Sequence, residues 1–279
     1  MSFSPSFFSL RPGEKLNRGF VRLLEVFARK VRRRPGDSEQ ELPEAIHQLR
    51  VLIKRFRALL WFVRPALPST MKRRTRRKLR KASHLLAAQR DAMIIGKTLE
   101  KVSRKSPNLL MCPAAIPENP EGKDRKKLRR LRQEAMKVFL QVIQEIRSAA
   151  RNNFSWPSPS DRLYKAFQAV KKTGKKALRE KKDAAFHDWR KKTKRLLHLL
   201  ELTQAAPTKR MEQTIRRTDR LQEKLGDYHD YAMTGMFLRN NPSAQLPRFF
   251  IRRSLHLLEK KKRHLQKKTR RLARSVKLH

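Results

Sequence analysis

The stretch His47-Gln48-Leu49-Arg50-Val51-Leu52-Ile53-Lys54-Arg55-Phe56-Arg57 decides the fold. A helix advances about 100° per residue, so its cations and its apolar residues separate onto two sides. One side carries a row of polar side chains roughly 15 Å long, made of His47, Arg50, Lys54 and Arg57. The other side carries an apolar stripe typical of a helix packed on a core, made of Leu49, Ile53, Phe56, Leu60 and Val63.

The same pattern returns 140 residues later, in the stretch from His187 to Arg195, which repeats H-x-x-R-x-x-x-K-R. Trp189, Leu196 and Leu200 take its apolar side. A second correspondence follows at an offset of 139 residues, where Arg77 and Lys81 match Arg216 and Arg220. Repetition at a fixed offset indicates an internal duplication. We therefore predict two related halves, residues 12–152 and 158–277, within one domain that spans 1–279.

Helical periodicity accounts for almost every long segment, and no run of alternating residues predicts a strand. The fold class predicted is all-α, with about five helices in each half. The expected helices cover 12–34, 43–64, 69–88, 91–101 and 123–152 in the first half, and 160–180, 183–202, 208–225, a short segment after Asp230 and 245–276 in the second. Four prolines between residues 103 and 122 predict a loop there.

A junction follows the third helix of each half, at 86–91 and at 225–230. In both, an aspartate is expected to begin a short helix, because a carboxylate suits the N-cap and the helix dipole. These residues are Asp91 and Asp230, and they are preceded by Arg90 and His229.

The net charge of the chain restricts the classes of function that the sequence supports. The 279 residues include 71 Lys and Arg against 24 Asp and Glu, a formal charge of +47. Such a charge strains the compact state by self-repulsion, so it predicts a polyanionic partner. Nucleic acid, a membrane surface and a chain of phosphates fit equally well on charge alone. The single cysteine, Cys112, excludes an intrachain disulfide, and no signal peptide or membrane-length apolar run is recognised, so a cytoplasmic protein without membrane association is expected.

The ordered set of motifs resembles the conserved-histidine α-helical domain family, CHAD. The residues that carry the resemblance are His47, Arg50, Lys54, Arg55 and Arg57, the junction from Leu86 to Asp91, the second motif at His187, and Leu221-Gln222 with Leu225-Gly226-Asp227 and Asp230. The resemblance implies two helical-bundle halves related by pseudo-twofold symmetry around a basic central cavity that binds inorganic polyphosphate. It also implies association with polyphosphate granules. Two residues depart from the pattern: Leu197 aligns with Arg57, and Ala87 stands opposite Gly226.

Lysine supplies a point charge and arginine a fork of donors, and both suit the oxygens of a phosphate chain. The residues predicted to bind polyphosphate are His47, Arg50, Lys54, Arg57, Arg77, Lys81, Arg90, His187, Arg190, Lys194, Arg216 and Arg220. The sequence leaves open whether His47 and His187 contact phosphate or are structural. A metal role is disfavoured because no further ligand stands at i+3 or i+4, where Arg50 and Val51 follow His47 and Arg190 and Lys191 follow His187, and because cations disfavour a metal.

Three functions remain. The first is a polyphosphate-binding module that docks on cytoplasmic polyphosphate granules. The second is a nucleic-acid binder indifferent to sequence, which would require aromatic side chains that stack on the bases of single strands or a helix that enters a groove of the duplex. The third is a phosphatase or kinase acting on polyphosphate. No metal cluster, nucleophile elbow or phosphate-cradling loop is recognised, so no enzymatic activity, catalytic residue, metal or cofactor is predicted. The oligomeric state is not predicted.

Overall fold

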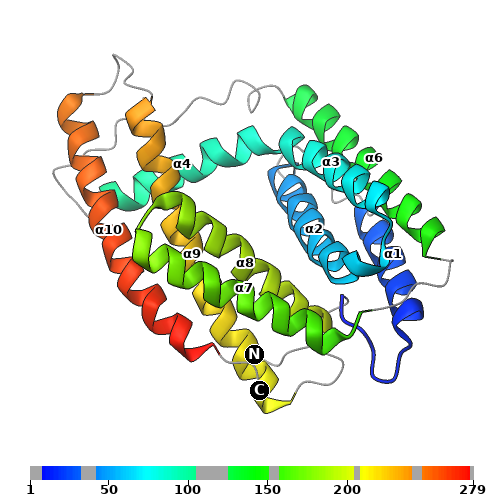
Figure 1. Cartoon of the computed structure of the whole chain (residues 1–279). Helices are drawn as coiled ribbons and strands as arrows, with labels where there is room; N and C mark the ends of the chain where they lie inside the picture. Colours follow the sequence, from blue (N-terminus) through cyan, green and yellow to red (C-terminus); the bar gives the residue numbers. More distant parts are fainter. Residues whose placement is uncertain are drawn as a thin grey trace.

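The computed structural model describes residues 8–32, 42–104, 125–150, 157–203, 208–240 and 247–276, without the side chains of 88–90. All regular structure in these ranges is helical, which confirms the all-α class (Figure 1). The helices are α1 (Leu16–Arg32), α2 (Leu42–Val63), a 3-10 turn (Arg64–Ala66), α3 (Ser69–Leu85), α4 (Ala87–Ser103), α6 (Arg125–Ala149), α7 (Pro159–Glu180), α8 (Asp183–Thr203), α9 (Lys209–Asn240) and α10 (Arg248–Ser275).

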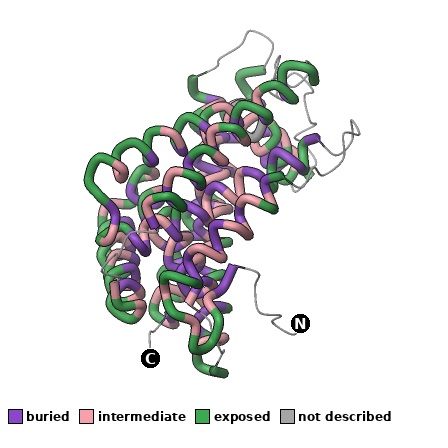
Figure 2. The backbone as a smooth tube through the Cα atoms, turned by 90° about the vertical axis from the view of Figure 1, so that its right-hand side faces the viewer, coloured by how far each residue is buried: buried purple, intermediate pink, exposed green. Residues whose placement is uncertain are grey.

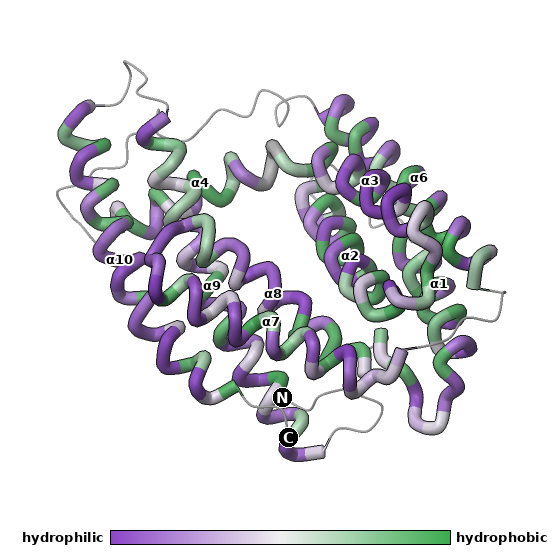
Figure 3. Tube along the Cα trace, viewed as in Figure 1, coloured by the Kyte–Doolittle hydropathy of each residue, from purple (hydrophilic) through white to green (hydrophobic). Residues whose placement is uncertain are grey.

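Each helix is amphipathic, as the periodicity predicts. Figure 2 shows buried residues along the inward side of the helices and exposed residues on the outer turns. Figure 3 shows hydrophobic and hydrophilic residues alternating around the same helices. Burial of these apolar stripes stabilises helices that short-range propensity alone would leave marginal in water. No helix of the described ranges is long and apolar enough to cross a membrane.

Aromatic rings fill the core of the first half, where α1, α2, α3 and α6 pack together. Phe56 of α2 lies edge-on between Phe27 of α1 and Phe139 of α6, with ring centroids 5.2 and 5.0 Å apart. Such edge-to-face pairs add to the free energy gained by burying apolar area. The apolar side of the opening stretch therefore builds the core, as its pattern predicts.

A polar network joins α8, α9 and α10 of the second half. The ring of Tyr228 stacks on Phe186 with centroids 4.2 Å apart, and its hydroxyl donates to Asp183 at 2.8 Å. The ammonium group of Lys262 lies 2.7 Å from Asp183 and 3.0 Å from Glu259, and Lys262 is only 6% exposed. Runs of basic residues such as 260–262 are usually solvated, whereas the charge of Lys262 is buried and paired.

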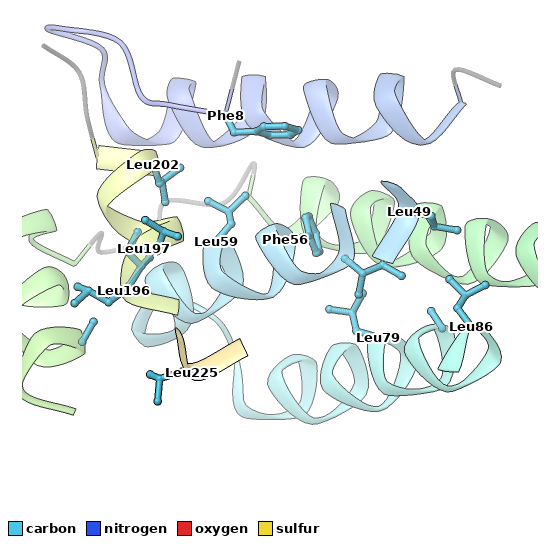
Figure 4. Close-up of a cluster of buried hydrophobic side chains, with 14 of the residues drawn as sticks. Phe8, Leu49, Phe56, Leu59, Leu79, Leu86, Leu196, Leu197, Leu202 and Leu225 are labelled. Carbon is cyan, nitrogen blue, oxygen red and sulfur yellow. The ribbon is translucent and has the colours of Figure 1, made fainter. Parts of the chain in front are cut away.

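The two halves share one apolar core. Helices α2 and α8 pack against each other, and the close-up in Figure 4 shows Leu59 of α2 beside Leu197 and Leu202 of α8. Helix α4 follows the first half in sequence but packs mainly on α9 and also on α10 (Figure 1). The N-terminal segment adds a tie, because the amide of Leu10 donates to the carbonyl of Leu202 at 2.8 Å.

The predicted break at the second junction is wrong. Helix α9 runs without interruption from Lys209 to Asn240 through Gly226, which has no left-handed φ. Leu221, Leu225 and Tyr228 are buried at helical spacing on both sides of the glycine, so continuous packing maintains the helix. Asp230 consequently lies inside a helix and caps nothing. The second half has four described helices instead of five.

The first junction does separate two helices, but not where the aspartate predicts. Leu86 lies between α3 and α4, and α4 begins at Ala87, so Asp91 lies inside α4 and does not begin it. Ser69 is the first residue of α3, and no side-chain hydrogen bond caps that helix, whereas Ser158 caps α7 by accepting from the amide of Asp161. The predicted loop at 103–122 lies, after residue 104, outside the described ranges.

Gly174 of α7 gives a test of packing in the second half. An added Cβ there would lie 2.9 Å from the indole ring of Trp189, which is fully buried and cannot move aside. We expect Gly174→Ala to lower the free energy of unfolding by about 1–3 kcal/mol through overpacking. The measurement is urea unfolding followed by circular dichroism.

Gly226→Ala is the matched control for that change. A Cβ on Gly226 would meet its nearest neighbouring atom at 3.9 Å, an ordinary contact. Because alanine is the better helix former, we expect stability to be unchanged or to rise by up to about 1 kcal/mol. Equal effects of the two alanines would contradict the close packing of α7 on α8.

Candidate functional site

Six arginines meet where α2 approaches α3, α7 and α8. They are Arg57 of α2, Arg64 of the 3-10 turn, Arg76 and Arg80 of α3, Arg162 of α7 and Arg195 of α8. We refer to these six as the arginine cluster. Helix α2 contacts both α3 and α8 (Figure 1), so it brings cations of the two halves together.

Burial and the charges of neighbouring arginines both act on two members of the cluster. Surrounding protein atoms lower the pKa of Arg57, and the charges of Arg76 and Arg80 lower it further. Burial likewise lowers the pKa of Arg195, and the charges of Arg57, Arg162 and Arg64 add to this effect while Asp188 opposes it. Each shift means that the charged form is disfavoured in the folded protein, although a guanidinium stays protonated at neutral pH.

Trp61 holds two of the arginines in place. The guanidinium carbon of Arg162 lies 3.8 Å from the centroid of a Trp61 ring, and that of Arg195 lies 5.0 Å from it. Arg162 is buried and donates to the backbone carbonyls of Trp61 and Phe62, the latter at 3.0 Å. These cation–π and hydrogen bonds fix the positive groups without neutralising them.

Other cations of α2 and α3 are paired with carboxylates. Lys81 lies 2.7 Å from Glu134 of α6, while Arg74 and Lys78 share Glu145 of the same helix. Arg55 lies 3.5 Å from Glu201 of α8.

The arginine cluster differs from these ion-paired cations. Across the described ranges, Arg57, Arg64, Arg76 and Arg80 form no ion pair with a carboxylate. The cluster is therefore a concentration of positive charge that the described part of the chain leaves available to an external anion.

Two predicted site residues lie near equivalent points of the repeat, at Leu86 and at Gly226. The guanidinium of Arg50 donates to the backbone carbonyl of Leu86, between α3 and α4. Arg190, the equivalent residue of the second motif, lies with its Nε near the position that a Cβ on Gly226 would occupy. Arg50 thus ties α2 to the start of α4, and Arg190 lies close to Gly226 of α9. A role in anion binding for Arg50 and Arg190 stays a prediction.

The remaining predicted residues are dispersed. Arg57 belongs to the arginine cluster. Arg77 is exposed and directly follows Arg76 of the cluster in the sequence. Arg216 lies 3.7 Å from Glu212. Lys54 is half-buried, and Arg220 and His47 are exposed. The side chain of Arg90 lies outside the described part. The Nδ1 atoms of His187 and His229 are 3.2 Å apart, so one ring donates to the other and at least one is neutral. For these residues, binding remains a prediction.

Sequence reasoning missed Arg64, Arg76, Arg80, Arg162 and Arg195. Arg195 could have been predicted, because it is the last residue of the second motif. Helix α3, however, carries eight Lys and Arg among 17 residues, so helical spacing alone does not choose between the face of Arg76 and Arg80 and that of Arg77 and Lys81.

Leu197 shows why the two motifs are unequal. It occupies the position equivalent to Arg57, yet it is buried in the shared core (Figure 4). The second half therefore contributes a core contact where the first contributes a cation.

Two carboxyl groups, those of Glu201 and Asp219, lie near Lys194 of α8. Burial opposes ionisation of Glu201, but a hydrogen bond from His198 and the charges of Arg55 and Lys194 bring its pKa below the usual value. Burial and the neighbouring Glu223 and Glu201 raise the pKa of Asp219. Lys194 consequently faces internal carboxylates, unlike the arginine cluster.

His198 gives a pH-dependent test of burial near these two carboxyl groups. Its side chain is 9% exposed, and burial lowers its pKa below the usual 6.5 despite the hydrogen bond to Glu201. The unfolded state then binds more protons in the window between the two values, so stability falls as the pH decreases through 6.5.

We expect His198→Gln to flatten the decrease of Tm between about pH 7.5 and 5.5, since glutamine does not titrate. His256→Gln is the control, because His256 is exposed on α10. The measurement is a series of thermal melts, and identical slopes for wild type and His198→Gln would contradict the burial argument.

Comparisons with known proteins agree with this architecture. The family model of the CHAD domain matches residues 22–239. The crystal structure of the CHAD domain from the plant Ricinus communis is similar to the chain with a TM-score of 0.62 at 17% sequence identity, over 99% of this chain and 98% of that one. No curated protein matches the chain. The chain belongs to the CHAD domain family, which supports a polyphosphate-related role at the level of the family and is generally a binding domain rather than a catalytic one.

Proposed function

We propose that the chain binds inorganic polyphosphate at the arginine cluster and thereby docks on cytoplasmic polyphosphate granules. The observation that carries the proposal is the convergence of six arginines, four of which have no carboxylate partner in the described ranges. The proposal includes no catalytic step and no cofactor.

Polyphosphate suits this cluster for a physical reason. The folded protein holds like charges together, so an anion that spans them would relieve a repulsion already present. Each guanidinium can donate two parallel hydrogen bonds to phosphate oxygens, and its charge does not depend on pH near neutrality. A chain of phosphates can reach arginines of both halves at once, and neutralising several of them releases the polyanion's condensed counterions.

The predicted site residues then fall into three kinds. Arg57 would contact the polyanion directly, whereas Arg50 would position α2 against the start of α4 and Arg190 would position α8 beside Gly226 of α9. Lys54, Arg77, Arg216 and Arg220 would extend the positive field beyond the cluster. The basic central cavity expected from the family resemblance remains a prediction, and the proposal does not depend on it.

Neutralising the cluster gives a direct test. We expect the triple variant Arg57→Gln, Arg76→Gln and Arg80→Gln to bind long-chain polyphosphate at least tenfold more weakly (about 1.4 kcal/mol or more). The slope of log K against log salt should fall by roughly 2, since three contacts are lost. Because the change removes a repulsion, the Tm of the free protein should not decrease. Titration by fluorescence anisotropy and thermal melts measure these quantities.

The matched control removes the same charge elsewhere. Lys267, Lys268 and Arg270 are exposed on α10, and their triple change to glutamine lowers the net charge equally. It should alter affinity by less than about threefold. An equal loss in both triple variants would mean that overall charge, and not the cluster, binds the polyanion.

A competition titration separates polyphosphate from nucleic acid. Trp61 is already covered by Arg162 and Arg195, so its ring is not available as a stacking platform for bases. We expect unlabelled polyphosphate to displace a fluorescent polyphosphate probe at physiological salt far better, per phosphate, than double-stranded DNA or single-stranded RNA. Equal competition per phosphate would favour a nucleic-acid binder that is indifferent to sequence.

A further inference from the structure

A groove runs between α1 and α6 and is separate from the arginine cluster. Its volume is about 1110 Å³, and the residues that line it come from α1 and α6. On α1 the lining residues are spaced at 25, 28, 29 and 32, so they form one helical stripe. On α6 the lining extends from Arg132 to Arg147, which is roughly 22 Å or four helical turns.

The floor of the groove is apolar where Ala28, Met136, Leu140 and Ile143 line it, and the exposed side chains of Gln133, Gln141 and Gln144 line it beside them. Ile143 is 3% exposed, and Ala28, Met136 and Leu140 are half-buried along the same line. Met136, Leu140 and Ile143 follow one another at i, i+4 and i+7, the spacing of a helix face that packs on another helix. A phosphate chain gains nothing from such a floor, so the groove does not fit the ligand proposed for the arginine cluster.

The rim of the groove is cationic. Arg29 and Arg32 on α1 and Lys137 on α6 are exposed along it. Glu25 is the one acid among the described residues that line the groove, and it lies 2.8 Å from Arg147, which neutralises it. The groove thus combines a long apolar strip with a positive border.

We propose that this groove docks an acidic amphipathic α-helix of a partner protein. The lining stripes of α1 and α6 form a groove against which the apolar face of a third helix can pack. The positive rim selects a helix whose flanks carry Asp and Glu, and it orients that helix during the encounter. The length of the lining corresponds to about four turns of the incoming helix.

The probe is a fluorescein-labelled peptide of 18 residues with leucines at i, i+3 and i+4 spacing and glutamates at most other positions. The control is a peptide of the same composition in scrambled order, which has the same charge but no apolar face. Both would be titrated against the full chain at physiological salt by fluorescence anisotropy. We expect the amphipathic peptide to bind at least tenfold more tightly than the scrambled one.

Two variants address the floor and the rim separately. Leu140→Glu places a carboxylate on the floor, and Arg29→Glu with Lys137→Glu reverses two exposed charges without disturbing the core. We expect each to weaken peptide binding about tenfold or more. Lys267→Glu with Lys268→Glu makes the same charge change on α10 and should leave binding within about twofold. A photoreactive group on the apolar face of the peptide should cross-link to α1 and α6.

Several results would overturn the proposal. Equal binding of the scrambled peptide, an equal loss with the α10 control, or cross-links to other helices would each mean that only general charge attracts the probe. Displacement of the peptide by anionic lipid vesicles would assign the groove to a membrane surface. Dimerisation of the free chain that Leu140→Glu abolishes would assign it to a second copy of the chain. Polyphosphate affinity, measured in parallel, reports on the arginine cluster and is expected to be unchanged by Leu140→Glu.

Discussion

The packing of α2 on α8 is the constraint on which the rest of the structure depends. Leu59, Leu197 and Leu202 belong to one apolar core that extends through both halves. Burying this surface brings Arg57 and Arg195 together even though their charges repel, because the hydrophobic contribution of a continuous core exceeds the repulsion of partly solvated cations. The charge concentration is therefore a consequence of the same contact that joins the halves, and among the described residues no carboxylate forms an ion pair with Arg57, Arg64, Arg76 or Arg80.

Helical periodicity predicted most of the fold. The all-α class, the amphipathic α2 and α8 and the burial of Leu49, Ile53 and Phe56 all follow from the spacing of apolar residues. The second junction did not follow, since a glycine and two aspartates are typical of a helix end, whereas the buried Leu225 and Tyr228 continue the helical stripe through them. Tertiary packing decides between these two local signals, and it cannot be read from a single stretch.

The candidate site was predicted less completely. Repetition of a pattern reports that two residues have equivalent environments, but it does not say whether those environments serve binding or packing. Arg50 is repeated and bonds to a backbone carbonyl, while Arg76 has no repeated signal and lies beside Arg57. The rotation of α3 about its own axis determines which of its cations face the glutamates of α6 and which lie beside Arg57.

Helix α4 has a consequence for how such a protein could have arisen by duplication. Its apolar residues Ile95, Leu99 and Val102 are buried, and the helix packs largely on α9 and α10 of the other half. A single half without a partner would leave that face of α4 in water, so the duplicated fold buries it only because α9 and α10 of the second half cover it. Fusion of two copies places α4 and the surface that covers it in one chain, so this contact no longer depends on the encounter of two subunits.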